Sequence, residues 1–208
     1  MKEYGSSTEE LSPLVIIVID DLMKRIKEKF DTSIMFIDSS AAMERFNLPV
    51  FILSIWTPYG GLPIAVLILS DETEETLNFA FQKLKDFGIE INNVFTDDCS
   101  SLRNSLKNVW DQCITLLCTW HFTQAWWTWL LDSKHLVEAK NRQEIMRKIQ
   151  FCVFEKDETK VRNMVNEIKT ISNSVLQKKF DKDLNRIEEW AHYSRKSILK
   201  ISYWSKLL

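Results

Sequence analysis

Short apolar runs separated by turn-forming residues dominate the first half of the chain. Residues 34–37 form one such run, which ends at Asp38, and residues 49–56 and 63–69 form two longer ones. Apolar runs of this length without alternation are typical of strands covered on both faces. Because residues 57–61 (TPYGG) between the last two runs have turn chemistry, the pattern predicts an antiparallel hairpin over residues 49–69.

The spacing of apolar residues changes to a helical period after residue 73. Gly88 is expected to end a first helix, and Ser100 or Ser101 to cap the start of a second, with short strands at 93–96 and 114–117. The stripes of these two helices are Leu77, Phe81, Leu84 and Phe87, and then Leu102, Leu106, Val109 and Trp110.

From Phe122 onward only helical spacing is present. Three apolar stripes are expected to face a core: Ile145, Ile149, Cys152 and Val153; Val161, Met164, Val165 and Ile168; and Phe180, Leu184, Ile187 and Trp190.

These elements predict an α/β protein with a mixed five-stranded sheet and flanking helices, followed by an all-helical C-terminal segment. Three regions are expected: an N-terminal lead-in over residues 1–32, an α/β core over 33–125, and a helical region over 126–208. The apolar run 14–19 inside the lead-in fits either a strand or the start of a helix. It is too short to span a bilayer and follows two glutamates, so neither a membrane span nor a signal peptide is expected.

Charge divides the chain unevenly. Residues 1–139 carry 11 Lys and Arg against 20 Asp and Glu, whereas residues 140–208 carry 16 against 9. An acidic metal-binding half beside a basic surface for a nucleic-acid backbone would produce this division. Amphipathic helices with lysines on their solvated faces would produce it equally well. Four sparse, irregularly spaced cysteines favour a reducing, intracellular setting over a disulfide scaffold.

Two aspartates, Asp38 and Asp97, each follow a predicted buried strand. Carboxylates at the carboxyl ends of neighbouring strands could share divalent cations, and Mg²⁺ prefers carboxylate oxygen. Two such ions can activate water and stabilise the leaving oxygen in phosphodiester cleavage. The alternative is that an aspartate after a strand only forms a turn.

Cys118 and His121 have the spacing of half a zinc site, but a structural zinc normally takes four ligands. The later candidates His135, Cys152 and His192 are irregularly spaced, so zinc is a minor alternative to a packing role for Cys118 and His121. Nearby aromatic residues could stack on single-stranded bases, but a core role is the expectation for them. They are Trp120, Phe122, Trp126, Trp127 and Trp129.

Taken in order, five segments resemble the catalytic core of Mutator-like element (MULE-type) transposases. They are IMFIDSS, PVFILSIWTPYGGLPIAVLIL, DETEETLNFAFQKL, VFTDDCSSLRNSL and LLCTWHF. The resemblance covers residues 33–125 well and continues weakly to EEWAHYSR in the helical region. It implies an RNase H-like fold, with Asp38 and Asp97, rather than Asp98, as the first two acids of a catalytic triad of carboxylates. Cys118 and His121 match the Cys-x-x-His element of the family.

The resemblance further implies a Mg²⁺- or Mn²⁺-dependent site that cleaves and joins transposon-end DNA in the nucleus, with homo-oligomers possible. The third acid of the family, a glutamate, has no match, and Glu155, Glu158 and Glu167 are not assigned to it. We therefore expect a truncated copy with little activity alone. A second hypothesis is a non-catalytic module that binds DNA or protein through its basic half. A third is a small zinc-stabilised interaction domain.

Overall fold

The computed structural model describes residues 15–18, 25–26, 28–30, 32–40, 48–171 and 173–195. The chain forms two compact units, residues 1–115 and 116–208. Much of the N-terminal lead-in expected over residues 1–32 lies outside the described residues. The boundary between the units falls inside the last strand, so each unit is described by itself.

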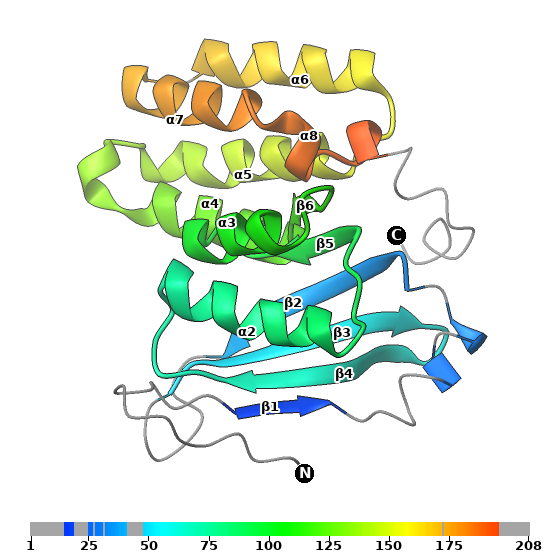
Figure 1. Cartoon of the computed structure of the whole chain (residues 1–208). Helices are drawn as coiled ribbons and strands as arrows, with labels where there is room; N and C mark the ends of the chain where they lie inside the picture. Colours follow the sequence, from blue (N-terminus) through cyan, green and yellow to red (C-terminus); the bar gives the residue numbers. More distant parts are fainter. Residues whose placement is uncertain are drawn as a thin grey trace. The chain divides into compact units, whose positions relative to one another are not determined.

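The first unit is built on a mixed β-sheet (Figure 1). Six strands follow the order β1-β4-β3-β2-β5-β6. Their bounds are β1 Val15–Val18, β2 Ile34–Ser40, β3 Val50–Thr57, β4 Gly60–Ile68, β5 Asn93–Thr96 and β6 Ile114–Leu117. Strands β1, β4, β3 and β2 pair antiparallel, and β5 pairs parallel with β2. The predicted α/β class and mixed sheet are thus confirmed, with six strands in place of five.

The additional strand is β1, in the run for which strand and helix were both open. Its four residues pair with β4, with Val15 opposite Ile68. The predicted hairpin is β3 and β4, in which Thr57 pairs with Gly60 across a two-residue turn. The Thr57 hydroxyl donates to the Gly60 carbonyl oxygen at 2.9 Å, and Gly60 has a φ of 118°. This backbone conformation costs glycine little, which explains a glycine here.

Helices α2 (Glu74–Asp86) and α3 (Ser100–Val109) complete the first unit. Thr73 is the N-cap of α2, and its side chain accepts from the Thr76 amide. The predicted cap of α3 at Ser100 or Ser101 is wrong, because Ser100 is already the first residue of the helix and Cys99 is the N-cap. Both helices bury their apolar stripes in one core with alternate residues of the strands. This core includes Leu77, Phe81, Leu84, Leu102 and Leu106 from the helices, and Met35, Ile37, Phe51, Leu53, Ile55 and Val94 from the sheet.

One member of the predicted stripe of α2 is wrong. Phe87 is 50% exposed, because the helix ends at Asp86 and the chain turns at Gly88, which has a φ of 80°. The Ile89 amide donates back to the Leu84 carbonyl oxygen at 3.1 Å, and Ile89 enters the core instead. This is the usual way in which a glycine ends a helix with a hydrophobic contact behind it.

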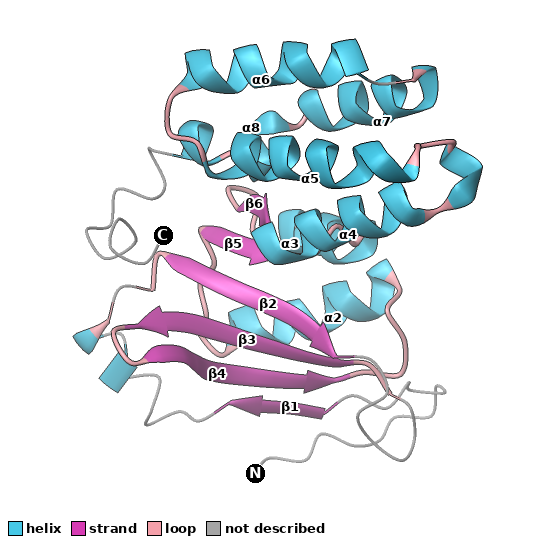
Figure 2. Ribbon diagram, turned by 180° about the vertical axis from the view of Figure 1, so that it is seen from behind, coloured by secondary structure: helices cyan, strands magenta, loops and turns pink. Residues whose placement is uncertain are grey.

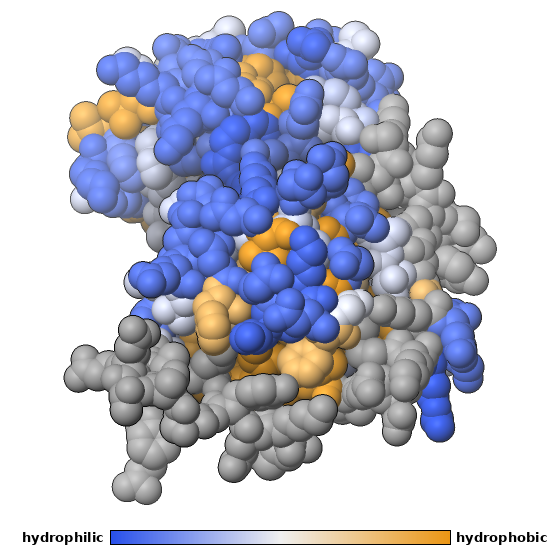
Figure 3. Space-filling model, viewed as in Figure 1, coloured by the Kyte–Doolittle hydropathy of each residue, from blue (hydrophilic) through white to orange (hydrophobic). Residues whose placement is uncertain are grey.

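The second unit is helical after β6 (Figure 2). Its elements are α4 (Thr119–Leu131), η1 (Ser133–His135), α5 (Ala139–Phe154), α6 (Glu158–Ile171), α7 (Ser174–Leu184), α8 (Ile187–Trp190) and η2 (His192–Arg195). The helical segment expected here is therefore confirmed within the described residues. In Figure 3 the outer surface of α6 and α7 is mainly hydrophilic, with smaller hydrophobic patches.

The inner faces of these helices form a second core. Ile145, Ile149, Cys152 and Val153 of α5 and Val161 and Ile168 of α6 are all buried in it, as the stripes predict. Trp190 is 1% exposed, stacks on Phe122 with ring centroids 4.9 Å apart, and donates from Nε1 to the Asp183 carbonyl oxygen at 2.7 Å. Arg195 closes the unit, because its Nη2 donates to the Leu117 carbonyl oxygen of β6 at 2.8 Å.

Candidate functional site

The prediction that Asp38 ends its strand is wrong, because β2 continues to Ser40, whereas Asp97 directly follows β5 as predicted. These two strands are direct neighbours. Strands β2 and β5 pair in parallel with Phe36 opposite Phe95, and these two rings stack with centroids 5.3 Å apart at an interplanar angle of 11°. The paired positions stop here, and Asp38 and Asp97 each lie two residues beyond the last pair. Adjacent strands lie about 4.8 Å apart, so the two aspartates lie at the same end of this parallel pair.

Asp38 belongs to the sheet face opposite the first core. Successive side chains of a strand alternate between faces, and Met35, Ile37 and Val94 lie in the core with α2 and α3. Phe36, Phe95 and Asp38 therefore belong to the other face, whereas Asp97 follows the end of β5. Asp38 is exposed and Asp97 partly exposed, so both carboxylates are accessible to solvent and to a ligand.

The turn after β5 distinguishes Asp97 from Asp98. Asp97 Oδ1 accepts from the Cys99 amide at 3.3 Å, so one oxygen of this side chain stabilises the start of α3. Asp98 forms an ion pair with Arg103, whose Nη1 lies 3.1 Å from Asp98 Oδ1. Because Arg103 is 7% exposed and also donates to Thr115, Asp98 serves as the partner of a buried cation.

Two carboxylates suit one particular class of metal. Among the described residues, no group of three His, Cys, Asp or Glu side chains is placed to hold an ion. Mg²⁺, however, is commonly held by one or two carboxylates, with water and phosphate oxygens completing its octahedron. Asp38 and Asp97 would supply the two protein oxygens of such a site.

Cys118 and His121 lie at the start of α4, and Cys118 is its N-cap. The His121 ring makes an edge contact with Trp120, with centroids 4.7 Å apart. Two residues considered as further zinc ligands are engaged elsewhere. His135 stacks on Trp129, with its Nδ1 2.7 Å from the Trp129 carbonyl oxygen, and Cys152 is fully buried. Burial raises the pKa of the Cys152 thiol to about 12, which disfavours the thiolate that zinc requires.

The aromatic stretch around α4 divides between two faces of the helix. Phe122 and Trp126 are buried in the second core, and Trp129 packs against it, so the core interpretation is confirmed for these three. It is wrong for Trp120 and Trp127, which are 62% and 37% exposed. Helical spacing explains the division, because residues 122, 126 and 129 share one face and residues 120 and 127 share another.

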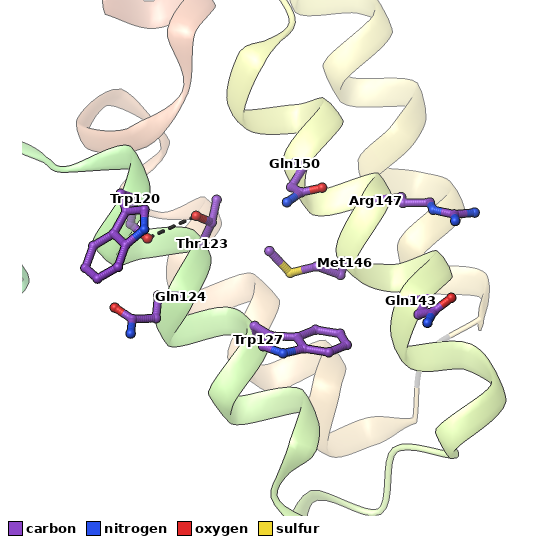
Figure 4. A pocket seen from close by; sticks show the side chains of 8 residues that line it. All are labelled: Trp120, Thr123, Gln124, Trp127, Gln143, Met146, Arg147 and Gln150. Atoms are coloured by element: carbon purple, nitrogen blue, oxygen red, sulfur yellow. Dashed lines mark hydrogen bonds between the residues drawn. The ribbon is translucent and has the colours of Figure 1, made fainter.

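The two exposed tryptophans line a groove between α4 and α5 (Figure 4). Residues from α5 form its other side, and sequence reasoning missed them. The lining residues are Trp120, Thr123, Gln124, Trp127, Gln143, Met146, Arg147 and Gln150. Gln143, Arg147 and Gln150 recur at helical spacing on α5, which is the pattern that could have indicated a shared face. The sequence near the tryptophans contains no Arg or Lys, but the fold brings Arg147 to them.

Comparisons with known proteins leave the chain without an assigned family. No family model matches it, and no curated protein matches it either. No helix in the described part of the chain is both long and apolar enough to cross a membrane.

Proposed function

We propose that the first unit carries two carboxylates of an RNase H-like, metal-dependent site for phosphodiester cleavage and strand transfer on DNA, as in MULE-type transposases. The observation that supports this most is the parallel pairing of β2 with β5, which puts Asp38 and Asp97 at the same end of two adjacent strands. Asp38 is exposed and Asp97 is partly exposed, so both carboxylates are accessible to a metal ion.

The chemistry assigned to this chain is the binding of a divalent cation between the two carboxylates. When bound, Mg²⁺ or Mn²⁺ would polarise a phosphate and activate water. Since the described residues offer two carboxylates at this place and no third ligand, we expect weak metal binding and low activity from the chain alone. Action on transposon ends, a nuclear location and self-association belong to the same proposal.

Metal binding tests the proposal more directly than activity. Titration of the purified protein with Mn²⁺, followed by the paramagnetic relaxation of water protons, should show a site that is lost in both Asp38→Asn and Asp97→Asn. Asp98→Asn is the matched control, because this adjacent acid is paired with Arg103. Nicking of supercoiled plasmid DNA, where detectable, should follow the same order. Equal Mn²⁺ binding by all four proteins would refute the role of the aspartate pair.

A further inference from the structure

The groove between α4 and α5 has the composition of a ligand site rather than of a gap in packing. It has a volume of about 550 Å³ and belongs entirely to the second unit. Its lining combines two indole rings, three glutamine amides, a threonine, a methionine and one arginine, with no acidic residue. We propose that this groove binds single-stranded nucleic acid, with unpaired bases stacked on the tryptophans and a backbone phosphate held by Arg147.

The tryptophans supply the stacking surfaces. Trp120 and Trp127 are seven residues apart, so they lie on one face of α4 and about 10.5 Å apart along its axis. Figure 4 shows Trp127 reaching from α4 toward α5, beside Met146. The second core already contains Phe122, Trp126 and Trp190, so the two exposed indoles are not needed to fill it. Exposed rings that no core requires are suited to stacking on bases, each of which has a planar face.

The glutamines supply hydrogen-bonding groups of matching shape. Within the described ranges, the side-chain amides of Gln124, Gln143 and Gln150 make no hydrogen bond. A planar amide that donates and accepts at once complements the edge of an unpaired base. The Thr123 hydroxyl is not available to a base in the same way. It already donates to the Thr119 and Trp120 carbonyl oxygens of its own helix, at 2.9 and 3.0 Å.

Arg147 determines the charge of the ligand. It is the single ionisable group among the lining residues, it is exposed, and in the described part of the chain it forms no ion pair. The neighbouring cation Lys148, by contrast, lies 2.5 Å from Glu167. A guanidinium left without a carboxylate in an aromatic groove favours an anion, and phosphate is the anion that accompanies a planar base.

A single strand fits these groups better than a duplex or a peptide. In a duplex the bases are stacked on one another and their edges are paired, so neither the indoles nor the amides could reach them. An extended peptide would use the indoles and amides, but it gives no reason for the unpaired Arg147. Binding by this groove is independent of the aspartate pair in the first unit, so each proposal can fail without the other.

The experiment measures binding of the full chain to a fluorescein-labelled oligothymidylate of about twelve nucleotides. Fluorescence anisotropy at low salt, in EDTA, gives the dissociation constant. A blunt-ended DNA duplex and a proline-rich peptide serve as competitors. Each base–aromatic stack contributes about 1–3 kcal/mol, so Trp120→Ala and Trp127→Ala should each weaken binding by about fivefold to a hundredfold. Arg147→Gln should weaken binding and reduce its salt dependence.

Controls separate the groove from general effects of charge and aromatic surface. Lys182→Gln on α7 removes the same charge as Arg147→Gln, and Phe79→Ala on α2 removes another exposed ring. Both should bind like the wild type. Trp127→Phe keeps an aromatic ring and should retain part of the affinity. That result would show that the alanine variants bind weakly because they lose stacking and not because they fail to fold. Unchanged affinity in the groove variants, preference for the duplex, or displacement by the proline-rich peptide would overturn the proposal.

Discussion

Replacing Arg103 with methionine should lower the free energy of unfolding of the first unit by about 2–4 kcal/mol. The guanidinium is 7% exposed, and its Nη2 donates to Thr115 Oγ1 at 3.1 Å and to the Thr115 carbonyl oxygen at 3.4 Å. Hydrogen bonds from a charged donor contribute about 1.5–3 kcal/mol. The ion pair with Asp98 adds at most about 1 kcal/mol, because the side chain of Asp98 is 58% exposed to solvent. Methionine keeps the apolar stem, so little packing is lost.

Asp98→Ala is the companion variant. It removes the exposed ion pair and leaves the buried bonds to Thr115, so it should cost no more than about 1 kcal/mol. Urea unfolding gives the stabilities, and amide hydrogen exchange of peptides covering α3 assigns the change to the first unit. The reasoning is refuted if Arg103→Met is as stable as the wild type, or if Asp98→Ala is equally damaging.

Two further predictions concern titration. Hydrogen bonds from the Thr73 hydroxyl and amide lower the pKa of Asp71 from 3.8 to about 2. The stability advantage of the wild type over Asp71→Ala should therefore be complete above the unfolded value and disappear as the pH falls through about 2. Thermal unfolding across this range measures it, and a constant difference would contradict it. Burial raises the pKa of Cys113 to about 11 and that of Cys152 to about 12. Iodoacetamide at about pH 8 should therefore alkylate Cys99 and Cys118 in the native protein. It should alkylate Cys113 and Cys152 only after unfolding, as peptide mass spectrometry would show.

Much of the sheet could be predicted from sequence, since runs such as residues 49–56 and 63–69 have few structural alternatives. The edge strand β1 was harder, because a strand of four residues with Val15 and Ile17 exposed lacks both length and a buried pattern on two faces. The exposure of Phe87 depended on where a helix ended, and the stripe alone did not contain that information.

The candidate sites show the same division. Asp38 and Asp97 could be named because each directly follows a short apolar run in the sequence. That they lie at the same end of adjacent strands depends on a pairing between segments about sixty residues apart. Only the side of the groove that α4 contributes could be predicted from the sequence. Spacing on α4 separates Trp120 and Trp127 from the buried aromatics, whereas Arg147 reaches them through the packing of one helix against another.

The parallel register of β2 and β5 has a consequence for how related chains can differ. Side chains alternate between faces, so a single residue inserted or deleted in β2 before Asp38 would turn this side chain toward the core. Strands β3 and β4, which lie between β2 and β5 in the sequence, carry the same restriction through their own registers. Changes of length should therefore accumulate in the loops between these elements in any descendant that keeps Asp38 on the accessible face.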